Sequence, residues 1–369
     1  MSKRIFSMIA CTLACTLIVC TMMTVPVWAS DADGAERIIY ANAVRGAVRN
    51  LPMIAEFDDH IETIREARED LQSLLELRRA AGTLTREERD LMQREIANLG
   101  ANINTMRATQ EMLRTGTEAA MRGSMTNINN SVLDIKLMEA SLEHERTNLN
   151  NARLRFGAGL ISESDLHTQD LLVSQIEANL AGMQVSLETE RQELNRILQR
   201  PVTGNFYVYF ERELIELPEN LDAHVRHVAP RQPNVRQADI ALNRAQAYFS
   251  DVHIDFASPE RAERERARNQ RQRERNELLR NVETAMRNHY NTLTMLKHNM
   301  DSLEIDLLRA TERLEAVTLN HQAGLATQFD IEAAALAVLR YEIRIEQNLN
   351  TFWNAQFAFE NPFLLTMGS

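Results

Sequence analysis

Histidines are the side chains in this sequence best suited to metal chemistry. His224 and His227 stand three residues apart, so on one helix they would share a face and could hold the same ion. No cysteine accompanies them, and the sequence offers no evident third ligand. His144 precedes Glu145, but the second histidine of a zinc-protease motif is missing. We therefore expect no metal site, and His289 is better explained as a polar register position in a coiled coil.

Catalytic motifs are missing from the sequence as well. It contains no nucleophile motif and no glycine-rich phosphate-binding loop. Acidic residues are numerous, but no pair of carboxylates stands out from what a solvated helix surface would carry. The sequence therefore predicts a protein that is not an enzyme and that needs no cofactor.

One arginine-rich segment, residues 261–275, contains seven arginines and three glutamates. Such a segment can bind phosphate groups, and in an exported protein these would belong to envelope polyanions. It can also be a solvated helix held by ion pairs four residues apart, such as Glu260 with Arg264. The ion-paired helix is the simpler interpretation, and the polyanion contact is its alternative.

The segment 1–29 has the pattern of a secretory signal peptide. Lys3 and Arg4 form a basic start, an apolar stretch runs to about Val25, and residues 27–29 make a cleavage site with a small final residue. We expect export and removal of this segment, the alternative being an uncleaved membrane anchor. All three cysteines lie inside it, so the mature chain is expected to have no disulfide.

The remaining composition favours long helices. The chain has 12 Gly, 8 Pro and 5% aromatic residues, and is rich in Glu, Arg, Leu, Ala, Asn and Gln. Loss of Lys3 and Arg4 takes the formal net charge from −11 to −13, which argues against a nucleic-acid partner. No later segment has the long, uninterrupted apolar run of a membrane-spanning helix.

Apolar residues recur every seven positions in stripes, and each stripe has a copy whose residue numbers are higher by 165. A seven-residue period is the signature of supercoiled helices. One stripe is Leu166, Val173, Leu180, Leu187 and Leu194, and its copy is Ile331, Val338, Ile345, Phe352 and Phe359. The other is Met121, Ile128, Ile135, Leu142 and Leu149, and its copy is Met286, Leu293, Met300, Leu307 and Leu314. The sequence thus predicts an all-α fold of two tandem, long, antiparallel coiled-coil hairpins.

Each hairpin turns at a matching short motif. A glycine can end the incoming helix in the left-handed conformation, and a Ser or Thr followed three residues later by Asp forms a variant of the capping box at the start of the next helix. The matching pairs are Gly159 and Gly324, Leu160 and Leu325, Ser162 and Thr327, and Asp165 and Asp330. We expect a tight, capped tip on each hairpin.

The repeat sets the expected boundaries of the chain. They are a signal peptide at 1–29, a first hairpin repeat at 30–201, a connecting segment at 202–222, a second hairpin repeat at 223–362 and a C-terminal tail at 363–369. Gly204 to Pro218 is the only stretch that looks like a strand. A helix beginning near Pro52 and another near Pro233 are each expected to stack end to end with a short outgoing arm.

The tip motif Arg155-Phe-Gly-Ala-Gly-Leu-Ile-Ser-Glu-Ser-Asp-Leu166 and its second copy resemble those of TolC-type outer membrane efflux proteins. The segment Ala229-Pro-Arg-Gln-Pro-Asn-Val-Arg-Gln-Ala and the boundary Leu198-Gln-Arg-Pro201 are also similar to that family. The resemblance covers about residues 36 to 360. It implies a TolC-like α-helical barrel protomer.

The resemblance also implies partners and roles. In that family three chains form a hollow twelve-helix cylinder in the periplasm, whose tips meet a periplasmic adaptor linked to an inner-membrane pump of the ABC or RND type. The adaptor-facing residues here would be those of the two tips, namely Gly159, Leu160, Ser162, Asp165, Gly324, Leu325, Thr327 and Asp330. Asp330 would also line an entrance constriction, although the second acidic position of some members is Ala333 here.

One departure from the family concerns the strands that form its membrane pore. Members with a pore insert two β-strands per repeat, at places that correspond here to Asp58–Leu91 and Phe249–Leu279. Neither segment alternates apolar and polar residues as a lipid-facing strand does, and both look like charged helix and turn. The family resemblance implies residence in the outer membrane or periplasm, but these segments predict that the β-barrel strands are missing and that the chain does not insert by itself.

The sequence therefore predicts an efflux duct subunit of a tripartite export system, assembled as a homotrimer. A trimer also follows from geometry, because two hairpins expose apolar seams on both flanks that a monomer leaves uncovered. The alternative is a coiled-coil tether or adaptor of the envelope that conducts nothing.

Overall fold

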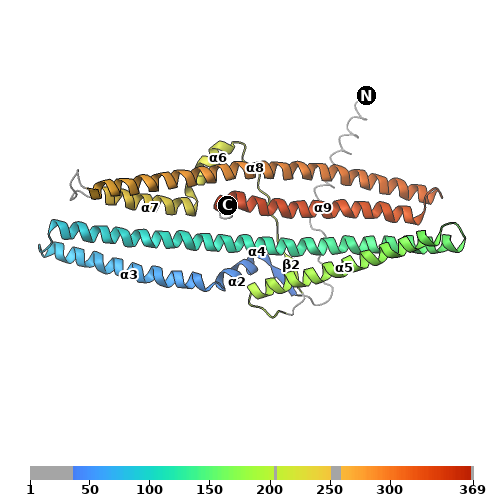
Figure 1. Cartoon of the computed structure of the whole chain (residues 1–369), viewed down its shortest axis with the longest axis horizontal. Helices are drawn as coiled ribbons and strands as arrows, with labels where there is room; N and C mark the ends of the chain where they lie inside the picture. The colour runs from blue at the N-terminus through green and yellow to red at the C-terminus, as the bar shows by residue number, and fades with distance from the viewer. Residues whose placement is uncertain (1–35, 203–205, 251–258, 367–369) are drawn as a thin grey trace, which may run out of the picture. The chain divides into compact units, whose positions relative to one another are not determined.

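A computed structural model describes residues 36–202, 206–250 and 259–366 of the chain. The predicted signal peptide, the three cysteines, residues 203–205 of the connecting segment and positions 367–369 of the tail lie outside the described residues. The described part is almost entirely helical, which confirms the all-α prediction (Figure 1). No helix within it is long and apolar enough to cross a membrane.

By its contacts the chain divides into two units. One contains Met1–Arg37 and Asn205–Tyr207, and the other contains Ile38–Gly204 and Val208–Ser369. The described residues of the first unit belong to two short strands, β1 (Glu36–Ile39) and β2 (Phe206–Tyr209), which pair in a two-stranded sheet. The second unit holds the helices.

The first repeat is built along one very long helix. This helix, α4 (Arg86–Gly157), pairs with α3 (Pro52–Ala80) over one half of its length and with α5 (Glu163–Ile197) over the other (Figure 1). The short helix α2 (Tyr40–Arg49) packs on α4 between them. The helix that begins at Pro52, α3, therefore lies end to end with the outgoing helix α5 along α4, as predicted.

The second repeat has the same plan. Its long helix, α8 (Pro259–Gln322), pairs with α7 (Pro233–Phe249) and with α9 (Gln328–Glu360). The helix α6 (Leu221–Val228) and the 3-10 turn η1 (Ala229–Arg231) lead from the connecting segment into α7, and the 3-10 turn η2 (Pro362–Leu365) follows α9. The long incoming helices have 72 and 64 residues, and the outgoing helices α5 and α9 have 35 and 33.

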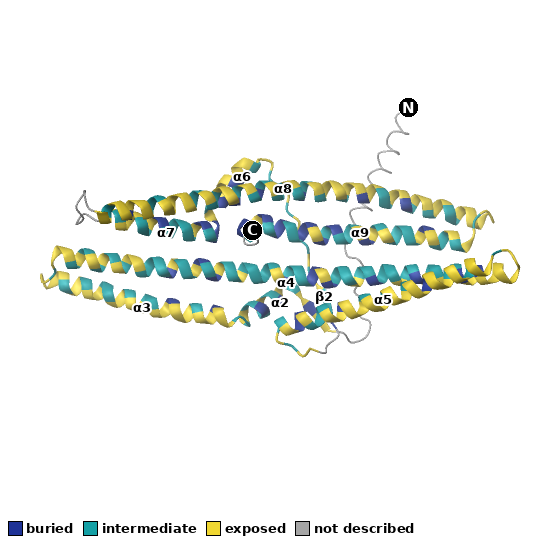
Figure 2. Ribbon diagram, in the orientation of Figure 1, coloured by how far each residue is buried: buried dark blue, intermediate teal, exposed yellow. Residues whose placement is uncertain are grey.

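The heptad stripes pack between the arms of each hairpin. In the first hairpin Leu142 and Leu149 of α4 cluster with Val173 of α5. In the second, Met286 and Leu293 of α8 share a larger core with Phe352 and Phe359 of α9, and with apolar residues of α6 and α7. Figure 2 shows the result: buried positions mark α8 and α9, whereas most of α5 is exposed. Burial of these side chains, at about 25 cal/mol per Å² of apolar surface, stabilises each hairpin.

The two repeats meet where α4 packs against α9 and α7, and polar side chains cross this seam. Gln347 donates to Asp134 Oδ1 at 2.7 Å, and Asn350 donates to Asn130 Oδ1 at 2.7 Å. One helical turn further along, the Asn354 amide donates to the Thr126 hydroxyl, also at 2.7 Å. Asn350 is completely buried, so its amide must be hydrogen-bonded to be tolerated there. Side-chain hydrogen bonds thus fix the register of one repeat on the other.

Two expectations about strands have different outcomes. The segment Asp58–Leu91 is the end of α3, a turn and the start of α4, as predicted. The described part of Phe249–Leu279 is helix as well, with residues 251–258 outside the described residues. The prediction that Gly204 to Pro218 is the only strand-like stretch was wrong, because Glu36–Ile39 pairs with β2. Four residues are too few to show a period of two, so this strand has no signal of its own in the sequence.

Candidate functional site

Both hairpin tips end their long helix with the same backbone motif. In the first tip Gly159 has φ of 70°, its N–H donates to Phe156 O at 2.8 Å, and the Leu160 N–H donates to Arg155 O at 2.9 Å. In the second tip Gly324 has φ of 74° and the equivalent bonds measure 2.9 and 2.8 Å. This is the Schellman motif, which satisfies the last carbonyls of the helix. The left-handed conformation explains why both positions are glycine.

The outgoing helices begin with capping boxes, as predicted. The Ser162 side chain accepts from the Asp165 N–H, and the Asp165 carboxylate accepts from the Ser162 N–H at 3.1 Å and from its hydroxyl at 2.7 Å. Thr327 and Asp330 repeat this at 2.8 and 2.7 Å. The hydroxyl and N–H donors stabilise the carboxylate and so hold the pKa of Asp165 and of Asp330 below the ordinary value. Each tip is therefore a preformed turn.

Large apolar side chains project from both tips into solvent. Leu160 is 69% exposed and Leu325 is 79% exposed. Leu154 and Leu319, which are not among the predicted tip residues, are 67% and 65% exposed and occupy equivalent positions in the two repeats. The constant offset between the repeats could have found this pair, because both members are leucine. An exposed leucine gains free energy when it is covered, so a contact made at the tips would be stabilised by these four leucines.

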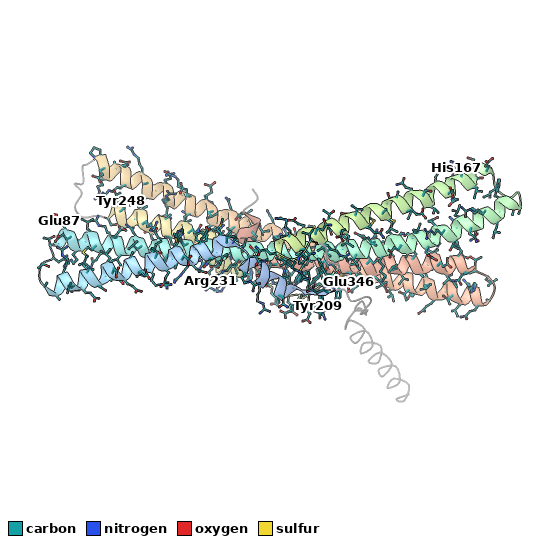
Figure 3. The ribbon with its side chains drawn as sticks, turned by 90° about the horizontal axis from the view of Figure 1, so that it is seen from below. Glu87, His167, Tyr209, Arg231, Tyr248 and Glu346 are labelled. Atoms are coloured by element: carbon teal, nitrogen blue, oxygen red, sulfur yellow. The ribbon has the colours of Figure 1, made fainter. Side chains whose placement is uncertain are left out.

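The two tips lie at the same position along the direction of the long helices. The hydrogen bond between Asp134 of α4 and Gln347 of α9 joins the hairpins and gives a common reference point. At 1.5 Å per residue, Gly159 lies about 37 Å from Asp134 along its helix and Gly324 lies about 35 Å from Gln347. Nearer the tips, the His144 ring of α4 stacks on Phe329 of α9 with centroids 4.3 Å apart. Figure 1 shows both turns at one end of the helices, and Figure 3 labels His167 near the first of them.

Asp330 is exposed at the start of α9, where a constriction was expected. One of its oxygens, Oδ2, accepts both capping bonds. The residue is exposed, so its negative charge remains accessible to solvent. Ala333, one turn further on, is exposed and adds no charge. A constriction built on Asp330 and an adaptor contact at the eight tip residues both stay predictions.

Of the histidines considered for metal binding, His144 and His224 pack on aromatic rings, and His227 lies beside Arg231 at the surface. His224 stacks on Phe359 with ring centroids 5.1 Å apart, and desolvation by burial, helped by the nearby His227, lowers the pKa of His224. His289 lies 2.8 Å from the Ala355 carbonyl oxygen, between the two arms of the second hairpin. In the part of the chain that the structure describes, no three His, Cys, Asp or Glu side chains gather closely enough to hold a metal ion.

The arginine-rich segment contacts its own surroundings. Arg264 donates to Glu260 at 2.7 Å, the pair expected from the sequence, and to the Tyr248 carbonyl oxygen at 2.7 Å. Arg268 lies over the Phe249 ring, 4.2 Å from its centroid, and Arg275 donates to Asp239 at 2.8 Å. The Glu260 pair is the ion pair expected from the sequence, and the other three contacts tie the start of α8 to α7. A polyanion contact at 261–275 stays a prediction.

Solved structures share this arrangement of helices. Neither a protein-family model nor a curated protein matches the sequence. The outer membrane channel CmeC of Campylobacter jejuni is similar at a TM-score of 0.62 and 10% identity, over 87% of this chain and 85% of that one. The outer membrane protein VceC of Vibrio cholerae is similar at 0.57 and 11%, over 88% and 95%. The MtrE outer membrane channel of Neisseria gonorrhoeae gives 0.52 and 13%, over 87% and 88%. CmeC and MtrE are outer membrane channels and VceC is an outer membrane protein, and the chain shares the TolC-type fold of these structures.

Proposed function

We propose that this chain is the duct subunit of a tripartite efflux system in the cell envelope. Three copies enclose a hollow helical conduit in the periplasm, joined to the outer membrane. Its tips dock on a periplasmic adaptor that receives substrates from an inner-membrane pump of the ABC or RND type. The observation that carries this proposal is the pair of matched, preformed tips at one height, each presenting exposed leucines.

Assembly into a ring accounts for the flanks of the hairpins. Several large apolar side chains on α5 and α8 are more than half exposed, and a monomer leaves them in water. They are Leu171, Val185, Met295, Ile305 and Leu308. A neighbouring copy that covers them would recover the free energy of their burial. A head-to-tail contact joins different flanks of neighbouring copies. It closes into a ring when the rotation that relates one copy to the next divides a full turn evenly.

Export by cells that carry tip variants tests the docking step. Leu160→Asp combined with Leu325→Asp places charge where we propose an apolar contact, on side chains that contribute little to the fold because they are exposed. The matched control is Leu77→Asp, on a leucine of α3 that is 68% exposed and remote from the tips. We expect the tip variant to lose export and the control to retain it, at equal protein levels.

Two outcomes would overturn the proposal. A mature protein that is monomeric by mass measurement at working concentration has no ring and no duct. Full export by the doubly substituted tip variant, or by cells that lack the chain, would favour a coiled-coil tether that conducts nothing.

A further inference from the structure

A pocket of about 440 Å³ lies at the elbow where α2 turns into α3. Its floor is apolar and consists of Val44, Val48, Leu51 and Ile54. The buried Gln110 of α4 holds the elbow in place, because its amide donates to the Ile54 carbonyl oxygen at 3.3 Å and to Asp58 at 2.7 Å. We call this feature the elbow pocket.

Three arginines surround the elbow pocket, and they are short of negative partners. Arg49 and Arg114 are exposed and form no ion pair or hydrogen bond with any residue that the structure describes. Arg45 donates only to neighbours on its own helix, the Ala41 carbonyl oxygen and Asn42. The one acid in the lining, Asp58, is bonded to Gln110. The pocket therefore combines an apolar floor with a positive rim.

The connection between β2 and α6 has the opposite character. In residues 211–219, which we call the acidic strap, Glu213, Glu216 and Glu219 are exposed, and their carboxylates meet no partner among the described residues. Between them Leu214 is 46% exposed. The strap thus carries three unpaired carboxylates and a leucine that faces solvent.

The backbone of the acidic strap is fixed on the second hairpin. Gln356 of α9 accepts from the Ile215 N–H at 3.0 Å and donates to the Glu213 carbonyl oxygen at 3.1 Å. At the start of the strap, Arg212 forms a partly buried ion pair with Glu346 at 2.5 Å. Figure 3 labels Glu346 and Tyr209 near this point, halfway along the helices. Because the backbone of the acidic strap is held in place, its exposed side chains lose less conformational entropy when they bind.

The elbow pocket and the α6 end of the acidic strap lie at nearly the same height along the helices. Arg122 of α4 donates to the Trp353 carbonyl oxygen, and His289 of α8 lies against the carbonyl oxygen of Ala355, two residues along the same helix. Arg114 is two helical turns, or about 12 Å, from Arg122 along α4.

On the other side, Tyr290, next to His289, donates to the Pro218 carbonyl oxygen in the strap. In Figure 1 the strap runs from β2, beside α2, across α9 to α6, which lies on the opposite side of the paired long helices from α2 and α3. Rotation about an axis parallel to the helices would therefore bring the pocket of one copy to the α6 end of the strap of another.

We propose that the elbow pocket of each copy receives the acidic strap of the next copy in the ring. Leu214 covers the apolar floor, and the three glutamates lie against the rim arginines. The contact joins two different surfaces, so it is of the head-to-tail type that closes rings. Opposite charges at the rim also set the orientation of the encounter. This inference rests on the ring of the proposed function and names the residues that would close it.

Cysteine cross-linking provides the first test. The native cysteines are Cys11, Cys15 and Cys20, all within the predicted signal peptide, so the mature protein supplies no competing thiol. Val48→Cys combined with Leu214→Cys, oxidised in the purified mature protein, should give covalent dimers and trimers, because a disulfide needs Cβ atoms within about 4.5 Å. Each single variant is the control and should give no covalent dimers or trimers.

Charge reversal provides the second test. Arg49→Glu with Arg114→Glu should weaken assembly at least tenfold, and addition of Glu216→Arg with Glu219→Arg should restore it. The matched control is Arg107→Glu, on an exposed arginine of α4 outside the pocket. Circular dichroism of each variant verifies that the helices are retained.

The outcomes separate this inference from the proposed function. A wild-type ring that yields no cross-link and that tolerates charge reversal would overturn the pocket-and-strap contact and leave the duct standing. An anionic amphiphile that copurifies with wild type and is lost in Arg49→Glu would identify a different occupant and overturn it too. A monomeric wild type would overturn both.

Discussion

The guanidinium of Arg122 lies 3.7 Å from the ring centroid of Trp353, and its Nη1 donates to the carbonyl oxygen of the same residue at 2.8 Å. Arg122 belongs to α4 and Trp353 to α9, so this contact joins the two repeats. Tyr40 of α2 completes the group: its ring meets Trp353 edge-on at 5.1 Å, and its hydroxyl donates to Glu118 at 3.0 Å. One charged side chain thus holds three helices together.

Replacement of Arg122 should separate the repeats before it unfolds either hairpin. Arg122→Met loses a desolvated cation–π contact and a hydrogen bond from a charged donor, together about 2–3 kcal/mol. Arg122→Lys keeps the charge but not the flat guanidinium, so it should recover only part of this. Thermal unfolding at fixed protein concentration measures the loss, with Arg107→Met as the exposed control. Equal midpoints for Arg122→Met and the control would contradict the assignment.

The same group predicts a loss of stability in alkali. Burial raises the pKa of Tyr40 to about 12 from its ordinary 10.0, because the phenolate is poorly solvated there. Because the pKa of Tyr40 is higher in the folded state, its neutral phenol contributes fully to the free energy of unfolding below about pH 10. This contribution is lost as the pH rises towards 12. The loss should reach about 1–2 kcal/mol once partial exposure is allowed for.

Tyr40→Phe should remove this dependence on pH, and Tyr248→Phe, at an exposed position, should not. Urea unfolding at a series of pH values measures both variants. An alkaline slope that persists unchanged in Tyr40→Phe would show that another group is responsible.

The capping boxes predict that acid loosens the tips. The pKa values of Asp165 and Asp330 are lowered by their capping bonds, so the stabilisation they provide is present above pH 4 and is lost as the pH falls through the lowered values. Ser162→Ala and Thr327→Ala remove the cap at neutral pH, at a cost of about 1 kcal/mol each.

Amide hydrogen exchange of the first turns of α5 and α9, corrected for the intrinsic rate at each pH, reports both effects. The alanine variants at pH 7 should resemble wild type at a pH below the lowered pKa values of the two aspartates. Unchanged protection of these turns in the variants would show that packing, rather than the cap, holds them.

The sequence predicted the hairpins because their cores repeat along the chain. Leu142, Leu149 and Val173 are buried where the heptads placed them, and a period of seven requires no knowledge of the partner helix. The seam between hairpins is different. Asp134 and Gln347 look like solvent-facing residues of two separate helices, and only the register of α4 on α9 shows that they bond.

The candidate site divides in the same way. The capped tips follow from local rules that link Gly159, Ser162 and Asp165, all within seven residues. The elbow pocket combines Val44 and Ile54 with Arg114, which lies far along the chain on a different helix. No local pattern connects these residues, so the pocket becomes visible only when α2, α3 and α4 have been packed together.

The end of α5 offers a substitution that should stabilise the protein. Gln199 has φ of 54°, its N–H donates to Arg196 O at 3.1 Å and the Arg200 N–H donates to Asn195 O at 2.9 Å, the same motif that glycine forms at both tips. A side chain in the left-handed conformation is strained, whereas glycine adopts it freely.

Gln199→Gly should therefore raise the free energy of unfolding by up to about 1 kcal/mol, the relief of strain being offset in part by the greater entropy of glycine in the unfolded chain. The reciprocal change, Gly159→Ala, should lower it by a similar amount through the backbone alone, because an added Cβ would meet nothing within 4 Å. Thermal midpoints of the two variants should move in opposite directions. If both fall, the Gln199 side chain makes a stabilising contact that outweighs its backbone strain, and the end of α5 is held by more than the helix cap.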